Sequence, residues 1–390
     1  MQKQKQKSIF IFKKDVKMII QRDIIDKFVK HLEDNKAIIL MGARQVGKTT
    51  ILKHLFKNKD NVLWLNGDDS DTREILANSN QTILKSVIGN KKIIVIDEAQ
   101  RIENIGLTLK ILTDSTKIKV IATGSASFDL SNKINEPLTG RKWEYNILPI
   151  SFKEMVNHNG LLEEKRMLKH RMIFGYYPDV INNSGDEIEI LRNLSNSYLY
   201  KDILTFDKMK KSSKIEKLLQ ALAFQVGSEV SYTEISKLIG LNSQTVEKYI
   251  GILEDAYIIF RVNCLSRNLR NELKKSKKIY FYDNGVRNAI ISQYNFFDFR
   301  QDKGALWENF LMSERQKYIE NNGKHCNQFF WRTRQQQEID YIEEKDGKLY
   351  AYEFKWNPLK KVRFTPTFSN AYPNSEFKVI TEDNYLDFIL

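Results

Sequence analysis

Long apolar runs are missing from this chain of 390 residues. No stretch approaches the ~20 consecutive apolar residues with which a helix spans a bilayer, so a membrane-embedded protein is not expected. Residues 1–7 are basic, but the apolar stretch at residues 8–12 is too short for a signal peptide and ends in Lys13 and Lys14. We therefore expect a cytoplasmic protein with no membrane partner.

Cysteine and histidine are also scarce. Cys264 and Cys326 are the only cysteines, and the chain has five histidines. Two cysteines form neither a disulfide framework nor a metal cluster. The sequence therefore argues against a disulfide-rich scaffold and against a structural zinc site.

Acidic residues are outnumbered by basic ones. The chain has 62 Lys and Arg against 49 Asp and Glu, which gives a net charge of +13. This excess permits a polyanionic partner such as nucleic acid. Because a lysine bias throughout an organism's proteins would produce the same total, the charge alone leaves the partner open.

The length and the composition favour a globular protein with several domains. A single hydrophobic core rarely organises 390 residues, so two or three domains are expected. Hydrophobic residues make up 42% of the chain and charged residues 28%, a balance typical of folded rather than disordered chains.

The motif that organises the chain is the stretch MGARQVGKTT at residues 41–50. It fits G-x-x-x-x-G-K-[ST], the phosphate loop of nucleotide-hydrolysing ATPases. An apolar run at residues 37–40 precedes it and is typical of a buried strand, and residues 49–56 have the pattern of a helix. A tight turn before an ordinary helix is the alternative, but the agreement of motif and flanks favours the phosphate loop.

Each residue type in this loop has a chemical role. Gly42 and Gly47 allow the tight backbone turn that directs amide N–H groups toward phosphate oxygens, and the following helix start adds partial positive charge. Lys48 would reach the terminal phosphates, and the Thr49 hydroxyl would bind Mg²⁺. The predicted ATP-binding residues are Gly42, Ala43, Arg44, Gln45, Val46, Gly47, Lys48, Thr49 and Thr50.

A second decisive stretch, KKIIVIDE, occupies residues 91–98. Its four consecutive β-branched residues predict a fully buried parallel strand, and two carboxylates stand at the carboxyl end, where open α/β sheets bind ligands. We predict that Asp97 holds Mg²⁺ through water and that Glu98 polarises the attacking water. Acidic residues also end strands and cap helices, but the upstream phosphate loop favours catalytic roles.

The next predicted strand, residues 117–125, ends in small hydroxyl residues. Thr123 or Ser125 fits the role of a sensor of the terminal phosphate, and an ordinary strand-ending turn fits equally well. Arg141 precedes a last strand and is a candidate arginine finger for phosphate in its own or a neighbouring subunit. Arg101 is a weaker candidate, and an exposed surface arginine is the alternative for both.

Several stretches together resemble a large bacterial and archaeal family of AAA-type ATPases. They are GARQVGKTT at 42–50, IDEAQR at 96–101, TGSAS at 123–127, and LTGR at 138–141 followed by LPISFKE at 148–154. The resemblance covers nearly the whole chain. It implies an ATP-binding protein with an additional strand in its core and a catalytic glutamate, followed by a C-terminal domain of unknown function.

The predicted fold class is α/β. We expect an N-terminal arm at residues 1–20, an AAA-type ATPase domain with a parallel sheet at 21–152, a helical connector at 153–210, a winged-helix domain at 211–285 and a restriction-endonuclease-like α/β domain at 286–390.

The winged-helix prediction rests on helix spacing and on charge. Predicted helices at residues 217–224, 231–239 and 243–256 precede a strand at 257–262, and Ser231 with Glu234 has the pattern of a capping box. Basic residues then cluster with only Glu272 against them: Arg261, Arg267, Arg270, Lys274, Lys275, Lys277 and Lys278. A basic wing suits phosphate contact, and a protein-contact module is the alternative. The predicted DNA-binding residues are Gln244, Lys248, Arg267, Arg270, Lys274 and Lys275.

The C-terminal third has the pattern of a nuclease core. A helix is predicted to begin at residue 304, and strands are predicted at residues 329–332, 338–342 and 348–355. Because strand residues alternate between faces, Glu353 and Lys355 project to the same side.

These elements resemble the PD-(D/E)xK core of restriction-type nucleases. Asp340 and Glu353 match its metal-binding acids, Lys355 matches its basic catalytic position, and Glu308 matches the acid of the first helix. Clustered acids of this kind bind Mg²⁺, which activates water. Ile339 stands where the usual proline precedes the aspartate, and an inactive fold with strand-capping charges is the alternative.

We therefore expect an ATPase that uses ATP and Mg²⁺ and couples its nucleotide state to a DNA-contacting, nuclease-like region. One alternative is an ATP-dependent switch or scaffold whose nuclease-like domain is inactive and binds partners. Another is a DNA-binding regulator that acts through its winged helix. Self-association into a homo-oligomer is expected from the resemblance and from Arg141.

Overall fold

The computed structural model describes residues 19–77, 79–125, 133–199, 212–265 and 277–390. The predicted DNA-binding residues Arg267, Arg270, Lys274 and Lys275 lie outside these ranges, as does most of the predicted N-terminal arm. No helix within the described ranges is long and apolar enough to cross a membrane.

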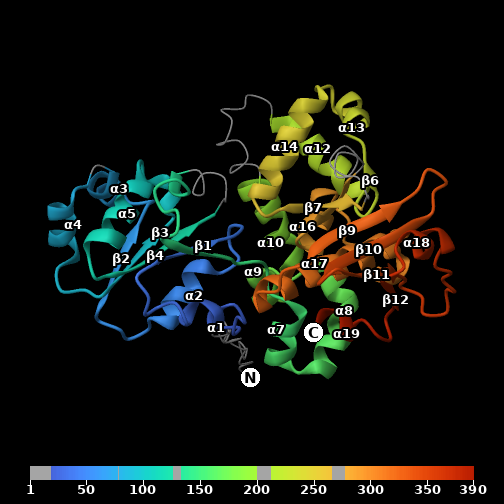
Figure 1. The fold of residues 1–390 in the computed structure, drawn as a ribbon, viewed down its shortest axis with the longest axis horizontal. Helices are drawn as coiled ribbons and strands as arrows, with labels where there is room; N and C mark the ends of the chain where they lie inside the picture. Colours follow the sequence, from blue (N-terminus) through green and yellow to red (C-terminus); the bar gives the residue numbers. More distant parts are fainter. Residues whose placement is uncertain (1–18, 78, 126–132, 200–211, 266–276) are drawn as a thin grey trace, which may run out of the picture.

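Two lobes, each built on one sheet, are joined by a set of connecting helices (Figure 1). The first lobe, drawn blue to cyan, contains a five-stranded sheet, and the second, drawn yellow to red, contains a seven-stranded sheet. The elements of the first lobe are α1 (Ile25–Val29), β1 (Ala37–Met41), α2 (Lys48–Leu55), β2 (Val62–Asn66), α3 (Ser70–Ala77), α4 (Gln81–Ile88), β3 (Ile93–Asp97), the 3-10 turn η1 (Ala99–Arg101), α5 (Ile105–Ser115), β4 (Lys119–Gly124) and β5 (Lys142–Asn146).

All strands of the first sheet are parallel, in the order β2-β3-β4-β1-β5. Every side chain of β1 is buried, as expected for a strand covered on both faces, whereas burial alternates along the edge strand β2. Since β4 lies between β1 and β3, the additional strand implied by the resemblance is present. The carboxyl ends of β1, β3 and β4 therefore lie side by side at one edge of the sheet.

The first helix is shorter than its apolar pattern predicts. The spacing predicts a helix over residues 22–33, but α1 covers only Ile25–Val29. Asp34 accepts hydrogen bonds from the Lys36 backbone N–H, from Lys119 Nζ and from Trp143 Nε1. These bonds hold residues 34–36 in a turn against the sheet, and the helix ends before it.

Between residues 152 and 199 the connecting region is mostly helical. It consists of α7 (Phe152–Asn159), α8 (Leu161–Phe174), α9 (Pro178–Asn182), α10 (Glu187–Asn193) and the π-helical turn η2 (Leu194–Leu199). A capping box starts α7, because Ser151 accepts from the Glu154 backbone N–H and Glu154 accepts from the Ser151 N–H. Gly175, with φ of 73°, then turns the chain from α8 toward α9.

The second lobe begins with three helices, one two-residue strand and two longer strands. These are α12 (Ser212–Phe224), β6 (Glu229–Val230), α13 (Tyr232–Ile239), α14 (Ser243–Asp255), β7 (Ile259–Cys264) and β8 (Lys277–Phe281). Ser231 and Asn242 cap α13 and α14 by accepting backbone N–H groups of Glu234 and Thr245. Both β6 and β7 pair antiparallel with β8.

The remaining strands extend the same sheet, and helices connect or follow them. These elements are α16 (Asn284–Ile290), the 3-10 turn η3 (Phe297–Phe299), α17 (Lys303–Asn322), β9 (Asn327–Arg332), β10 (Glu338–Lys345), β11 (Lys348–Phe354), α18 (Pro366–Ala371), β12 (Ser375–Ile380) and α19 (Leu386–Ile389). The strand order is β12-β11-β10-β9-β7-β8-β6, and β7 pairs parallel with β9 through Asn263–Phe329 and Cys264–Phe330. One continuous sheet therefore crosses the domain boundary predicted at residue 285.

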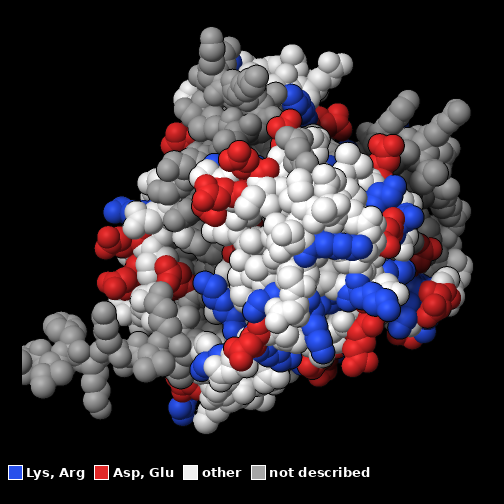
Figure 2. Space-filling model, turned by 90° about the vertical axis from the view of Figure 1, so that its left-hand side faces the viewer, with Lys and Arg blue, Asp and Glu red and all other residues white. Residues whose placement is uncertain are grey.

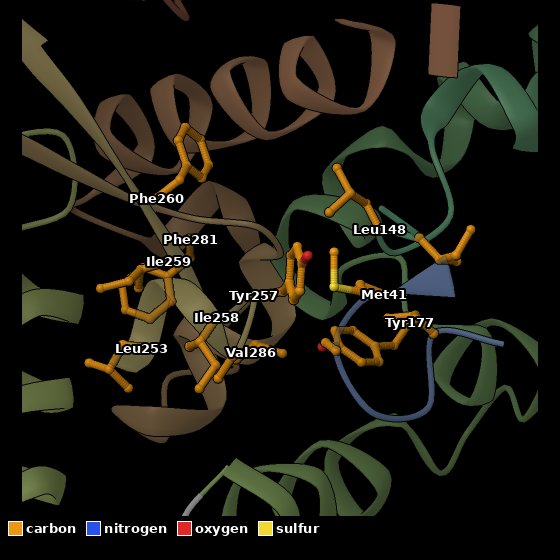
Figure 3. Packing of buried hydrophobic residues seen from close by; sticks show 14 of the residues in the cluster. Met41, Leu148, Tyr177, Leu253, Tyr257, Ile258, Ile259, Phe260, Phe281 and Val286 are labelled. Atoms are coloured by element: carbon orange, nitrogen blue, oxygen red, sulfur yellow. The ribbon is translucent and has the colours of Figure 1, made fainter. Parts of the chain in front are cut away.

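Buried apolar side chains also connect the lobes. Figure 3 shows Tyr257, just before β7, beside Met41 of β1, Leu148 and Tyr177. The Tyr257 hydroxyl donates a hydrogen bond of 2.6 Å to Asn146 Oδ1 at the end of β5. The carboxyl edge of the first sheet, where the phosphate loop begins, thus packs against the second lobe.

Candidate functional site

The phosphate loop connects β1 to α2 and depends on glycine at two positions. A Cβ added to Gly42, which has φ of 152°, would lie 2.1 Å from the Ile147 carbonyl oxygen, so a larger residue does not fit. Gly47, with φ of 99°, precedes α2 in a conformation that favours glycine. Both predicted glycine roles therefore have a structural reason.

The buried Lys48 side chain lies within its own loop. Lys48 Nζ donates hydrogen bonds of 2.8 Å to the backbone carbonyls of Gly42 and Ala43, and the residue is 5% exposed. The ammonium group is thereby held against the phosphate loop, where its positive charge would attract anionic phosphate oxygens.

Asp97, at the end of β3, is hydrogen-bonded to Thr49, the other magnesium ligand predicted for the ATP site. Thr49 Oγ1 donates a hydrogen bond of 2.8 Å to Asp97 Oδ2, and the Thr123 hydroxyl donates to Asp97 Oδ1. The Glu98 backbone N–H in turn donates to Thr123 Oγ1 at 3.2 Å. A hydroxyl and a carboxylate at this separation are the hard oxygen donors that Mg²⁺ prefers, so the residues present fit the ion.

Glu98 is held in an uncommon backbone conformation. Its φ of 50° and ψ of 41° are left-handed, which is costly for a residue with a side chain and is typical of functional sites. Gln100 Nε2 donates to Glu98 Oε2 at 2.6 Å and to Ser125 Oγ at 2.9 Å. Ser125 is thus linked to Glu98 through Gln100, a residue that sequence reasoning missed.

Arg22 supports the phosphate loop from behind and was also missed. Its buried guanidinium donates to the carbonyls of Val46 at 2.9 Å and Leu148 at 2.6 Å. Arg22 Nε also forms an ion pair of 3.0 Å with Glu154 of α7. No local motif could have revealed this residue, since Glu154 is 132 positions away.

Buried polar contacts continue from α7 into α17. The Phe152 N–H, at the start of α7, donates to Glu314 Oε2 at 2.6 Å. Lys317 Nζ donates to Glu314 Oε1 at 2.7 Å and to the Ile150 carbonyl at 3.0 Å. Glu314 and Lys317 are each 1% exposed. These bonds join the first turn of α7 to the long helix of the second lobe.

A cavity of about 940 Å³ adjoins the loop. It is lined by loop residues, by Ile19 and Ile20 and by α9 residues Pro178, Asp179 and Asn182. The cavity is therefore long enough to extend from the phosphate-binding end toward the connecting helices.

Arg141 lies at the far edge of the first sheet. The Ala37 N–H, at the start of β1, donates to the Arg141 carbonyl at 2.9 Å, whereas the phosphate loop follows the other end of that strand. A strand of this length spans about 16 Å, and Arg141 Nε instead bonds Asp114 Oδ1 at 2.8 Å. The prediction that Arg141 reaches phosphate in its own subunit is therefore wrong, and contact with a neighbouring subunit stays a prediction.

The acids predicted in the C-terminal third lie close together. Lys355 Nζ lies 2.7 Å from Glu353 Oε2 and 3.3 Å from Asp340 Oδ2, and the Phe354 N–H donates to Asp340 Oδ2 at 2.8 Å. Burial, together with the Asp340 carboxylate, raises the pKa of Glu353 to about 7. Burial also raises the pKa of Glu308, on α17, to about 7.

A lysine of β8 stands among these acids. Lys278 is 1% exposed, and its Nζ lies 2.6 Å from Glu338 Oε1, 3.1 Å from Glu308 Oε1 and 4.0 Å from Asp340 Oδ1. The sequence prediction assigned Lys278 to a basic wing, whereas the structure turns it inward. Among the described residues, no group of three or more His, Cys, Asp and Glu side chains is arranged to hold a metal ion.

The predicted DNA contacts are only partly described. Gln244 and Lys248 are exposed on α14, as the helical spacing predicts. The other basic residues of the predicted wing that the structure describes are paired with acids: Arg261 with Glu254, Lys277 with Glu247 at 3.7 Å and Lys278 with Glu338. On the side of the first lobe, Lys and Arg are interspersed with Asp and Glu (Figure 2).

The sequence matches three family models in succession. Residues 34–156 match the model of an AAA domain. Residues 165–295 and residues 303–388 match two further families, each described as a domain of unknown function.

Similar sequences occur in archaea and in bacteria. An uncharacterized protein of Methanocaldococcus jannaschii is 26% identical over 395 residues, covering 93% of this chain and 85% of that protein. An uncharacterized protein of Haemophilus influenzae is 24% identical over 395 residues, covering 94% of each chain.

Among solved structures, the Walker-type ATPase of Pyrococcus abyssi superposes with a TM-score of 0.48 and 16% identity, covering 70% of this chain and 96% of that one. The family match includes the glycines, the lysine and the two acids whose geometry is described above. Residues 34–156 thus match the model of an AAA domain and contain the phosphate loop described above, and the two regions that follow match families of unknown function.

Proposed function

We propose that the protein binds Mg²⁺ and ATP at the phosphate loop, hydrolyses the ATP and uses its nucleotide state to change the second lobe. The observation that carries the proposal is the hydrogen-bonded set of Thr49, Asp97, Thr123 and Glu98 at the ends of neighbouring elements. This set puts oxygen ligands and a carboxylate base beside Lys48, which is what phosphoryl transfer to water requires.

Each residue would have a distinct task in this reaction. Loop amides and Lys48 would bind the phosphate oxygens, and Thr49 and Asp97 would hold Mg²⁺, which supplies charge stabilisation when bound. Glu98 would orient the attacking water and accept its proton. The part of the cavity near α9 would hold the adenine ring of ATP, since Ile19, Ile20 and Pro178 provide apolar surface there.

Nucleotide state would reach the second lobe through α7. Arg22 bonds both the loop carbonyl of Val46 and Glu154, and the next polar contact, from Phe152 to Glu314, is on α17. Any shift of the loop on phosphate binding would therefore act on one buried chain of charged hydrogen bonds.

The test compares two substitutions in the full chain. Lys48→Ala should abolish nucleotide binding, measured by calorimetry, because the charge at the terminal phosphates is lost. Glu98→Gln should bind ATP but hydrolyse it about a hundredfold more slowly or worse, since the base is removed. Glu74→Gln, an exposed acid on α3, is the matched control. Normal turnover in Glu98→Gln would remove Glu98 from this role.

A second candidate function is DNA contact. The order of α12, β6, α13, α14, β7 and β8, with the antiparallel pairing of β6, β8 and β7, supports a winged-helix fold for this region. Gln244 and Lys248 are exposed on α14, the helix that would enter a groove.

DNA contact predicts a steep salt dependence. Lys248→Ala should weaken duplex binding and reduce the slope of log affinity against log salt by about 0.9. Lys237→Ala, an exposed lysine on α13, is the control and should leave the slope unchanged. Binding that is absent or insensitive to salt would favour a switch or scaffold without DNA contact.

We also propose that residues 303–380 have the PD-(D/E)xK arrangement. The order α17-β9-β10-β11-α18-β12 and the closeness of Asp340, Glu353 and Lys355 support this. The paired charges around Lys278 favour a region that binds partners over one that cleaves DNA.

A further inference from the structure

The acid cluster of the second lobe already contains a positive charge from the chain itself. Lys278 Nζ, on β8, lies within 4.0 Å of carboxylate oxygens of Glu338, Glu308 and Asp340, which belong to β10, α17 and β10 respectively. In a nuclease core of this type, Glu308 and Asp340 would bind a divalent cation. Here both lie beside an ammonium group.

Neighbouring side chains bond Glu338 and Glu308, and backbone covers Glu308. Arg332 Nη1 lies 3.6 Å from Glu338 Oε2 and 3.2 Å from Glu229 Oε2, so Glu338 faces two cations. A Cβ added to Gly227 would lie 3.1 Å from the Glu308 carboxyl carbon, which means that the chain before β6 covers this acid closely. The Tyr280 hydroxyl donates to Glu308 Oε1 at 2.7 Å.

We propose that the Lys278 ammonium takes the place of a divalent cation in this core, and that the acids around it fasten β8 to α17 and β10 instead of activating water. A divalent ion bound by Glu308 and Asp340 would have to share the space next to a buried ammonium, and the like charges would repel strongly at this depth. The inference rests on the nuclease-like geometry proposed above and is independent of the ATP site.

The Lys278 ammonium has favourable contacts on several sides. Burial alone would lower the pKa of Lys278, but the carboxylates of Glu308, Asp340 and Glu338 together raise it above its ordinary value. The ammonium also lies 5.5 Å from the ring centre of Phe330, a favourable cation–π distance. Three carboxylates and an aromatic ring therefore surround the side-chain nitrogen of Lys278, at the position that a metal ion would take.

The experiment is a Mn²⁺ titration of the full chain without nucleotide, followed by the paramagnetic resonance of free Mn²⁺. Lys278→Met keeps the length of the side chain and removes its charge. It should gain one Mn²⁺ site per chain, at least about tenfold tighter than any binding by the parent, because a unit charge about 4 Å from the site is gone. Adding Asp340→Asn to this variant should remove the new site.

Lys277→Met is the matched control, since Lys277 is the adjacent residue of β8 and faces Glu247 and the Tyr232 ring. It should gain no Mn²⁺ site. A folded Lys278→Met chain that binds no additional Mn²⁺ would overturn the proposal.

The unmodified chain gives a second arm that needs no substitution of Lys278. The parent chain and its Asp340→Asn variant, both with Lys278 in place, should show the same Mn²⁺ binding and no divalent-dependent DNA cleavage. An Asp340-dependent Mn²⁺ site or Asp340-dependent cleavage in the unmodified chain would overturn the proposal. A loss of ATP turnover bears only on the ATP site and is distinguishable from either result.

Discussion

Individual side chains in this protein are often held by partners far away in the sequence. Asp34 is an example: it accepts hydrogen bonds from Lys119 Nζ at 2.8 Å and from Trp143 Nε1 at 2.6 Å, and it lies in the turn that ends α1. Burial alone would raise the pKa of Asp34, but these bonds outweigh it and hold the pKa at about 2. Burial lowers the pKa of Lys119 despite its ion pair with Asp34. The pH dependence of this ion pair in acid therefore comes from the Asp34 carboxylate.

Asp34→Asn should therefore destabilise the protein in a pH-dependent way. The side chain of Asp34 is 35% exposed, so solvent screening limits the loss at pH 7 to roughly 1 kcal/mol. Because the folded pKa is depressed, the stabilisation is complete above the unfolded value of about 4 and is lost as the pH falls through 2. Urea unfolding from pH 7 to pH 2 measures this, and a pH-independent difference would contradict it.

The residues of the ATP site were predictable to the extent that their partners are local. Lys48 and Thr49 follow from a motif of fixed spacing, and Asp97 and Glu98 follow from a buried strand that ends in acids. Arg22 and Lys278 were not predictable in their actual roles, because their partners come from other elements. A sequence pattern gives the identity of a charged residue but does not show which way its side chain turns.

Among the elements, α7 bonds residues of both lobes. Its first turn contains the capping box of Ser151 and Glu154, and Glu154 also accepts from Arg22 and from the Asp23 N–H. The pattern Ser151-x-x-Glu154 indicates a helix start in the sequence. The sequence pattern does not show the ion pair between Glu154 and Arg22, which are 132 positions apart.

Glu154→Gln should weaken both stability and nucleotide binding. Removing one charge of a buried pair leaves Arg22 uncompensated, at a cost of about 3 kcal/mol. ATP affinity should fall as well, since Arg22 holds the Val46 carbonyl of the loop. Thermal unfolding and calorimetric titration measure the two effects, with Glu163→Gln, an exposed acid on α8, as the control. Full ATP affinity in Glu154→Gln would show that Arg22 does not support the loop.

Strand positions were largely predictable, but strand pairing was not. The predicted strands at 329–332, 338–342 and 348–355 correspond closely to β9, β10 and β11. Alternation along a strand indicates which face is buried and says nothing about the neighbouring strand. The pairing of β7 with β9 is non-local, and it was missed when the region was divided at residue 285.

At the scale of the whole molecule, this pairing makes the second lobe one sheet. The Leu265 N–H, just after β7, donates to the Phe330 carbonyl of β9 at 2.7 Å. Phe330 is fully buried, and its ring belongs to the same core as β7 residues Ile259 and Val262. The regions that match two separate family models therefore share both a sheet and a core.

Phe330→Ala should consequently lower protection in both regions. Removing a buried phenylalanine costs about 4 kcal/mol, and hydrogen exchange should speed up in β7 and β8 as well as in β9 and β10. Phe299→Ala, at a side chain that is 78% exposed, should change neither region. Loss of protection confined to β9 and β10 would mean that the two regions unfold independently.

The shared sheet also affects how the chain folds during its synthesis. Asn263 of β7 emerges from the ribosome well before its partner Phe329, by roughly 3 to 13 s at about 5–20 residues per second. Throughout that interval the open edge of β7 can pair with other chains. Yield of the intact protein should therefore depend on elongation rate and on chaperones that cover exposed strand edges, more than the modest size of each matched region would suggest.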